Sequence, residues 1–230
     1  MFRSWHDYKQ WATSLIHQGK PFYFRGHSNP EWQLRTSFHR LTDGTAMSLS
    51  RYFDELLPEV AEQASFYEKT LVKISGPREL SDYLGKLHYY GFPTPILSWS
   101  LSPYVAAYYA FRDLAEGDHA RVYALRYGSW TRHPSIIESL REPDPVIAAF
   151  GCYDPDRMRL MRELRVSIIS NASELVPFLG NHSETRLLTA EIPGSEREKA
   201  LSELAAMGID QVVGPPNENR VYTALKATFF

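Results

Sequence analysis

The sequence contains one cysteine, Cys152, among 230 residues. A single thiol cannot close an intramolecular disulfide, and no Cys/His spacing typical of a zinc site accompanies it. This content fits a reducing compartment. We therefore expect a cytoplasmic protein that needs no metal.

Long hydrophobic runs are also lacking. No segment approaches the roughly 20 consecutive apolar residues of a membrane-spanning helix. Residues 1–7 have no apolar core of the kind found in a signal peptide. We expect no association with a membrane.

The chain has no excess of positive charge, because its formal net charge is −2 at pH 7. This balance excludes a global field that would attract nucleic acid, but it leaves a local basic groove open. Low-complexity tracts and internal repeats are absent too.

What is present is an ordinary globular composition with 43% hydrophobic, 23% charged and 13% aromatic residues. The length allows one large domain or two small ones. We predict an α+β fold in one domain over residues 1–230, with an insertion at 128–155. Helices are predicted over 4–18, 48–75 with an interruption near Pro58, 78–90, 104–114, from 154 through Arg165, and from a capping box at 195–198 to Gly208. Strands are predicted over 21–25, 94–98, 121–127, 166–170, 186–192 and 209–213. The tail 219–230 can form a strand or a helix, and its Val221, Tyr222 and terminal Phe pair favour a strand.

Residues 22–28 (FYFRGHS) are the most informative segment of the chain. The apolar run predicts a buried strand with Arg25 at its exposed end. A guanidinium there can hold phosphate or ribose oxygens through parallel hydrogen bonds. Gly26 would allow a ligand to approach the backbone. An arginine paired with a carboxylate at a strand edge is the alternative.

A second cluster spans residues 88–103 (HYYGFPTPILSWSLSP), where a strand turns directly into a helix. Ser98 and Ser100 at the strand end can bond a sugar or an anion, or can simply complete a turn. Ser102 is better explained as a helix cap. His88 can act as a base, although a single histidine at a helix end is more often structural. Tyr89 and Tyr90 can belong to the core or stack on a flat ring of a ligand.

The third cluster is residues 215–222 (PPNENRVY). Glu218 follows a rigid turn and precedes an apolar stretch, a placement that suits a carboxylate projecting into a cleft. A solvated loop glutamate is the alternative, and composition alone favours it.

Residues 22–40 (FYFRGHSNPEWQLRTSFHR) resemble the opening signature of the FRG domain, which is named for its Phe/Tyr-Arg-Gly motif. Residues 88–110 resemble the second signature of that family, and residues 208–216 resemble its closing segment. Three positions depart from the second signature: Tyr89 replaces a histidine, Pro95 an arginine and Ser98 an aspartate.

FRG domains in turn resemble divergent ADP-ribosyltransferases. Such enzymes carry, in chain order, an Arg on an early strand, Ser-x-Ser before a helix and a late Glu. Arg25, Ser98-Trp99-Ser100 and Glu218 follow this order, and residues 217–222 resemble the segment around the glutamate of poly-ADP-ribose polymerases.

This resemblance implies a split mixed sheet with helical N-terminal and inserted segments, and NAD as the substrate. Arg25 and Glu218 become the expected catalytic residues, with Glu191 as the fallback carboxylate. The expected NAD-binding residues are Arg25, Gly26, His27, Tyr90, Ser98, Ser100 and Tyr109.

The chemistry requires these residue types. Cleavage of NAD breaks a glycosidic bond through an oxocarbenium-like transition state, which a carboxylate near the ribose stabilises. An arginine holds the pyrophosphate or the adjoining ribose.

The resemblance further implies a toxin-like effector of bacterial conflict or phage defence, with a neutralising antitoxin as one expected partner. The acceptor can be RNA or protein. RNA is favoured because Arg157, Arg159, Arg162 and Arg165 cluster in one predicted helix near expected surface tyrosines, although a solvated helix face explains the cluster at least as well. The alternatives are a binding module without chemistry and an NAD glycohydrolase or nuclease.

Overall fold

The protein is an α+β structure built on one six-stranded sheet in the order β4-β5-β2-β1-β3-β6. The computed structural model describes residues 2–19, 21–45, 47–127, 136–151, 154–180, 185–212 and 219–230. The strands are β1 (Tyr23–His27), β2 (Ile96–Ser100), β3 (His119–Tyr127), β4 (Ile147–Ala149), β5 (Arg165–Ser170) and β6 (Thr185–Pro193).

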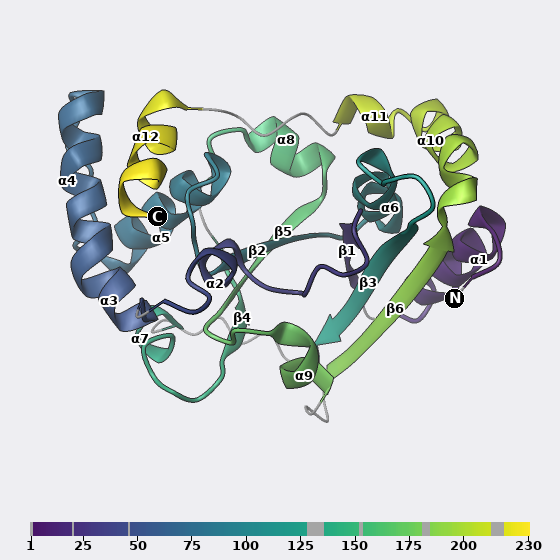
Figure 1. Ribbon diagram of the computed structural model, residues 1–230, viewed down its shortest axis with the longest axis horizontal. Helices are drawn as coiled ribbons and strands as arrows, with labels where there is room; N and C mark the ends of the chain where they lie inside the picture. Colours follow the sequence, from purple (N-terminus) through teal and green to yellow (C-terminus); the bar gives the residue numbers. More distant parts are fainter. Residues whose placement is uncertain are drawn as a thin grey trace.

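The sheet consists of two halves that meet at a narrow junction. Every pairing among the described strands is antiparallel, so the expectation of a mixed sheet is wrong. Strands β2 and β5 pair from Ile96↔Ile169 to Ser100↔Arg165. In contrast, β1 and β2 pair at the single position Phe24↔Ser100. The Arg25 strand and the Ser98 strand are thus neighbours in one sheet. Because they diverge on either side of this pair, the two halves β4-β5-β2 and β1-β3-β6 separate there (Figure 1).

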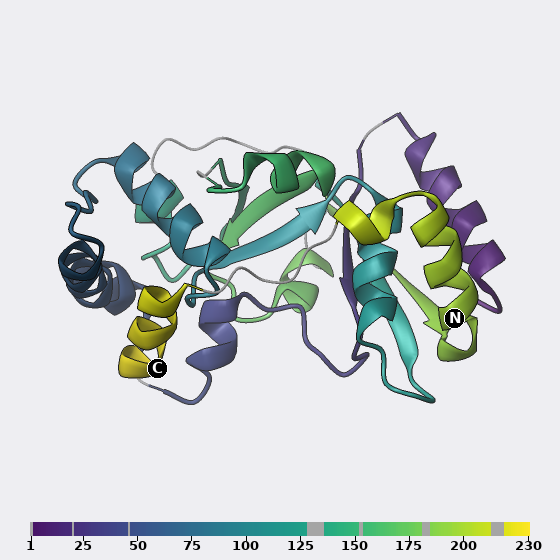
Figure 2. The same ribbon diagram turned by 90° about the horizontal axis from the view of Figure 1, so that it is seen from above.

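Helices gather at both ends of the sheet, as Figures 1 and 2 show from two directions. One end carries α3, α4, α5 and α12, and the other carries α1, α10 and α11. The helices are α1 (Trp5–Ile16), α2 (Ser37–Leu41), α3 (Leu49–Arg51), a π-helix η1 (Tyr52–Leu56), α4 (Leu57–Glu68), α5 (Pro77–Tyr89), α6 (Pro103–Arg112), α7 (Ile136–Ser139), α8 (Arg157–Arg162), α9 (Leu175–Gly180), a 3₁₀-helix η2 (Gly194–Glu196), α10 (Arg197–Ala206), α11 (Ile209–Val212) and α12 (Arg220–Phe229).

Local signals place the helices next to the sheet junction. The Ser102 side chain accepts a hydrogen bond from the Val105 N–H, and Pro103 opens α6, as the sequence predicts. Gly91 follows α5 with φ of 74°, which a residue with a side chain rarely adopts. At Pro58 the predicted interruption takes the form of the π-helix η1, which immediately precedes α4.

Three predictions for the C-terminal part are wrong. Residues 219–230 form helix α12 instead of a strand, because Asn219 caps it and Tyr222 and Leu225, three positions apart, are both buried. Residues 209–212 form helix α11. The expected capping box at 195–198 is absent, because η2 leads into α10 and no side chain caps that helix.

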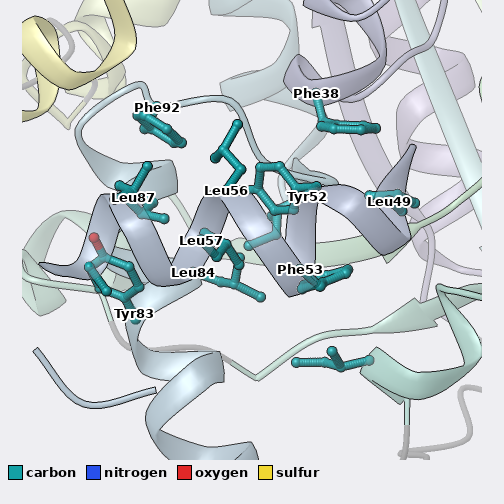
Figure 3. Close-up of a cluster of buried hydrophobic side chains, with 14 of the residues drawn as sticks. Phe38, Leu49, Tyr52, Phe53, Leu56, Leu57, Tyr83, Leu84, Leu87 and Phe92 are labelled. Atoms are coloured by element: carbon teal, nitrogen blue, oxygen red, sulfur yellow. The ribbon is translucent and has the colours of Figure 1, made fainter. Parts of the chain in front are cut away.

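A large apolar cluster fills the end of the molecule that carries α4 and α5. Figure 3 shows Leu56 and Leu57 beside Leu84, with Leu87 and Phe92 on one side of them and Tyr52 on the other. Helix α12 closes this cluster through Tyr222, whose ring stacks on Tyr90 with centroids 5.1 Å apart. A second cluster joins α1, α6 and α10 to the β1-β3-β6 half. The junction between the half-sheets is therefore supported by a packed core on each side.

None of the described helices has the length and apolar character needed to cross a membrane.

Candidate functional site

A cavity of about 280 Å³ lies at the junction of the two half-sheets. Its walls come from β1, β2, the end of α5, helix α6, helix α8 and the start of β5. The lining residues are Phe24, Arg25, Gly26, His88, Tyr89, Gly91, Ser98, Trp99, Ser100, Val105, Ala106, Tyr109, Arg159, Glu163 and Arg165. Of the predicted site residues, Arg25, Gly26, Ser98, Ser100 and Tyr109 are brought together here.

Arg25 is held in the cavity wall by two hydrogen bonds. Its Nε donates to His27 Nε2 at 3.1 Å, and its Nη1 donates to the Ser98 carbonyl at 2.6 Å. A guanidinium has five N–H donors, so three remain without a partner among the described residues. Burial, followed by the charge of Arg40, lowers the pKa of Arg25 to about 10, so the group stays protonated at neutral pH.

His27 orients Arg25 and does not line the cavity itself. Because arginine can only donate, His27 Nε2 must be the acceptor and Nδ1 must carry the proton. This Nδ1–H donates to the Trp32 carbonyl at 3.3 Å. Burial, together with the neighbouring Arg25 charge, lowers the pKa of His27 to about 3, so the ring stays neutral in its orienting role.

Gly26 makes room for a helix. A Cβ at this position would lie 1.9 Å from the carbonyl oxygen of Ala106 and 2.8 Å from the Ala110 nitrogen. Its φ is not in the left-handed region. The close approach of α6 to β1 therefore accounts for the glycine without a bound ligand.

Ser98 presents a hydroxyl whose orientation is fixed by His88. His88 Nε2 lies 2.8 Å from Ser98 Oγ, and His88 Nδ1 lies 3.0 Å from Thr94 Oγ1. Burial lowers the pKa of His88 to about 3, with further contributions from Arg165 and Arg25. A neutral imidazole between two hydroxyls positions Ser98, and it is too weak a base to remove a proton at neutral pH.

Ser100 serves the structure of the junction. Its hydroxyl donates to the Glu163 carbonyl at 2.7 Å and accepts a hydrogen bond from the Ser102 N–H at 2.9 Å. It thereby ties the turn between α8 and β5 to the start of α6. Of the two serines, Ser98 is the one that can offer its hydroxyl to a ligand.

A buried ion cluster forms another part of the cavity wall, and the sequence interpretation missed it. Glu163, only 3% exposed, accepts from Arg159 Nε at 2.7 Å and from Tyr109 Oη at 3.1 Å through Oε1. Arg165 binds Oε2 at 2.7 Å and reaches Asp154 at 2.7 Å. Both oxygens of this carboxylate are therefore engaged by cations.

The expectation of one helix bearing four arginines is wrong. Helix α8 ends at Arg162, and Arg165 opens β5. Leu164 between them has φ of 47°, so the chain turns sharply and Glu163 and Arg165 point to the same cluster. Arg157 and Arg162 are exposed, whereas Arg159 and Arg165 face the cavity.

The other predicted residues lie elsewhere. Tyr90 stacks on Tyr222 in the core, and the cavity is lined by Tyr89 instead. Glu191 lies on β6, paired with Arg121 at 2.7 Å, away from the cavity. Glu218 falls outside the described residues.

The charges of the site do not balance within the described part of the chain. Arg159 and Arg165 are matched by Glu163 and Asp154, but Arg25 has no carboxylate partner there. The cavity therefore has the electrostatics of an anion site. Across the described ranges, no group of three His, Cys, Asp or Glu side chains is placed to hold a metal ion.

Comparison with known proteins gives one match. No curated protein and no solved structure matches the chain. The family model of the FRG domain matches residues 20–119, which include Arg25, Gly26, Ser98 and Tyr109 but not the Arg159–Glu163–Arg165 cluster. Residues 20–119 are therefore similar to the FRG domain.

Proposed function

We propose that the cavity binds NAD and that the protein transfers ADP-ribose from it to a macromolecular target. One observation carries this proposal: Arg25 and Ser98, far apart in sequence, line one cavity, and the Arg25 charge there has no carboxylate partner among the described residues. A guanidinium with free donors suits two phosphate oxygens.

The size of the cavity indicates which part of NAD it would hold. Small-molecule sites typically enclose roughly 300–1,000 Å³, and this cavity of about 280 Å³ is near the lower end. We expect the nicotinamide, its ribose and the adjoining phosphate inside, with the adenosine outside. Tyr89 and Tyr109 supply aromatic walls for the ring.

In the proposed reaction the bond between ribose C1′ and the nicotinamide nitrogen breaks, and nicotinamide leaves as a neutral ring with the bonding electrons. An oxygen or nitrogen of the acceptor attacks C1′ and loses its proton to solvent. A carboxylate near the ribose stabilises the developing positive charge. Glu218 is the candidate for this group, supported by its sequence context alone.

A toxin-like effector role in bacterial conflict or phage defence remains part of the proposal. It rests on the resemblance to FRG and ADP-ribosyltransferase sequences, as does a neutralising antitoxin. RNA is favoured over protein as the acceptor.

A nucleotide-binding module without chemistry is the second candidate. Its support is that both oxygens of Glu163, the carboxylate that lines the described cavity, are engaged by Arg159, Arg165 and Tyr109. Such a neutralised carboxylate is poorly placed to stabilise an oxocarbenium ion.

Calorimetric titration with NAD tests the assignment. Arg25→Lys keeps the charge but loses the planar fork, so we expect affinity to fall about tenfold or more. Arg78→Lys is the matched control, because the Arg78 side chain is 95% exposed. Equal NAD affinity for the wild type and Arg25→Lys would make Arg25 a structural residue.

A further inference from the structure

A second concave surface lies beside the loop that connects β1 to α2. This hollow of about 530 Å³ is lined by Glu31, Trp32, Gln33, Arg35 and Arg40. Figure 1 shows the chain between β1 and α2 crossing in front of the sheet, so the loop borders the region of the half-sheet junction.

Trp32 is the aromatic residue in the lining of this hollow. Its residue is 52% exposed, although large aromatic side chains are usually buried. The backbone around it is fixed, because the Trp32 N–H donates to the Asn29 carbonyl at 3.2 Å and its own carbonyl accepts from His27. The exposed ring is therefore presented from an anchored turn.

Two arginines face the same hollow. Arg35 is anchored by Ser173 and Asp43, with its Nε 2.9 Å from the Ser173 carbonyl. Arg40 is exposed, and its guanidinium has no hydrogen-bond or ion-pair partner among the described residues. Glu31 contributes the one carboxylate of the lining. A free guanidinium beside an exposed indole is the combination that binds single-stranded nucleic acid, whose bases stack on aromatic rings while its phosphates meet cations.

The hollow is directly linked to the cavity. Arg25 Nε donates to His27 Nε2, and His27 Nδ1 donates to the Trp32 carbonyl. The charge of Arg40 also acts on Arg25 and His27, where it lowers both pKa values. The backbone that presents Trp32 is therefore joined, through His27, to the guanidinium that we assign to the NAD phosphate.

We propose that this hollow binds the acceptor as single-stranded nucleic acid, with a base stacked on Trp32 and a phosphate held by Arg40. That the bound nucleic acid is the acceptor rests on the proposed ADP-ribosyl transfer. The binding of nucleic acid in the hollow does not depend on that transfer. The exposed arginines of the α8 segment are not needed for it.

The test measures binding of a fluorescently labelled single-stranded RNA 12-mer by anisotropy, without NAD, with DNA of the same sequence as a second probe. Trp32→Ala should weaken binding roughly 5- to 100-fold, the usual effect of losing one stacked base, and Trp32→Phe should recover part of it. Arg40→Gln should weaken binding and reduce the slope of log affinity against log salt by about one.

Matched controls lie on the distant α4–α5 end of the molecule. Phe66→Ala removes an aromatic residue that is 80% exposed, and Arg78→Gln removes an exposed arginine. Both should bind like the wild type. No RNA or DNA binding, or equal losses for Trp32→Ala and Phe66→Ala, would overturn the inference and favour a protein acceptor.

The two proposals fail separately. Trp32→Phe keeps both the backbone carbonyl that His27 uses and an aromatic ring beside His27, so its release of nicotinamide from NAD without acceptor should equal that of the wild type. If the wild type binds RNA through Trp32 but never cleaves NAD, the transferase proposal fails and the nucleic-acid site stands. If NAD is cleaved but Trp32→Ala binds RNA as tightly as the wild type, only the inference about the hollow fails.

Discussion

Substitution of Gly26 by alanine tests how the cavity is built. The added Cβ would lie 1.9 Å from the Ala106 carbonyl oxygen and 2.9 Å from the carbonyl carbon. Both atoms belong to the backbone of α6, so no side-chain rotation relieves the overlap. Helix α6 must move away from β1, and with it Tyr109 and the cavity wall.

Overpacking a core usually costs about 1–3 kcal/mol, and a backbone clash places Gly26→Ala at the upper end, near ~3 kcal/mol. For a chain of this size each 1 kcal/mol lowers Tm by roughly 2–4 °C, so we expect a loss of about 6–12 °C. NAD affinity should fall as well, because the cavity wall shifts.

Thermal and urea unfolding measure this effect. Gly180→Ala is the matched control, because a Cβ at Gly180 meets no atom within 4 Å and its φ is not positive. The control should melt like the wild type. If Gly26→Ala were as stable as Gly180→Ala, helix packing would not explain Gly26, and close approach of a ligand would become the better account.

Three further predictions concern the buried ion cluster, the pH dependence of stability and the arginine in the cavity. Glu163→Gln should lower the free energy of unfolding by about 3–5 kcal/mol, because Arg159 loses its carboxylate partner in a buried site. Urea titration measures this free energy, and a decrease below about 1 kcal/mol would refute the prediction. Burial lowers the pKa of His88 to about 3, so below pH 6.5 the unfolded chain binds a proton there that the folded protein does not. The free energy of unfolding should therefore fall as pH drops from 6.5 toward 4. His88→Gln should reduce this dependence by about 1.4 kcal/mol per pH unit. Urea titrations at pH 4.5 and 5.5 measure it, and an equal change in the free energy of unfolding for the wild type and His88→Gln would contradict the burial of His88. Arg25→Lys should weaken binding of ADP-ribose as much as it weakens binding of NAD, because both ligands carry the phosphates. If calorimetry finds lower affinity for NAD but unchanged affinity for ADP-ribose, Arg25 contacts the nicotinamide instead.

Local sequence signals predict the elements around the cavity well. The serine cap and Pro103 mark α6, the glycine after α5 marks its end, and the apolar run before Arg25 marks β1. These features depend on residues within a few positions, so a single sequence contains them.

Features that depend on tertiary contacts are the ones that sequence reasoning missed. The aromatic residues of the tail favour a strand locally, but Tyr222 stacks on Tyr90, and this packing favours helix α12. The ion cluster around Glu163 depends on the turn at Leu164, whose positive φ no local pattern predicts. The i,i+4 spacing of Arg159 and Glu163 was the one available signal.

The central claim is that the cavity cleaves NAD with the help of a carboxylate. Nicotinamide release by the wild type and by Glu218→Gln, with RNA and protein acceptors offered in turn, tests it most directly. The account predicts release by the wild type, a rate on the order of 10²–10³ lower for Glu218→Gln, and equal thermal stability of the two proteins. A wild type that binds NAD but releases no nicotinamide with any acceptor would contradict the transferase assignment. Release at the wild-type rate by a normally folded Glu218→Gln would remove Glu218 from the mechanism.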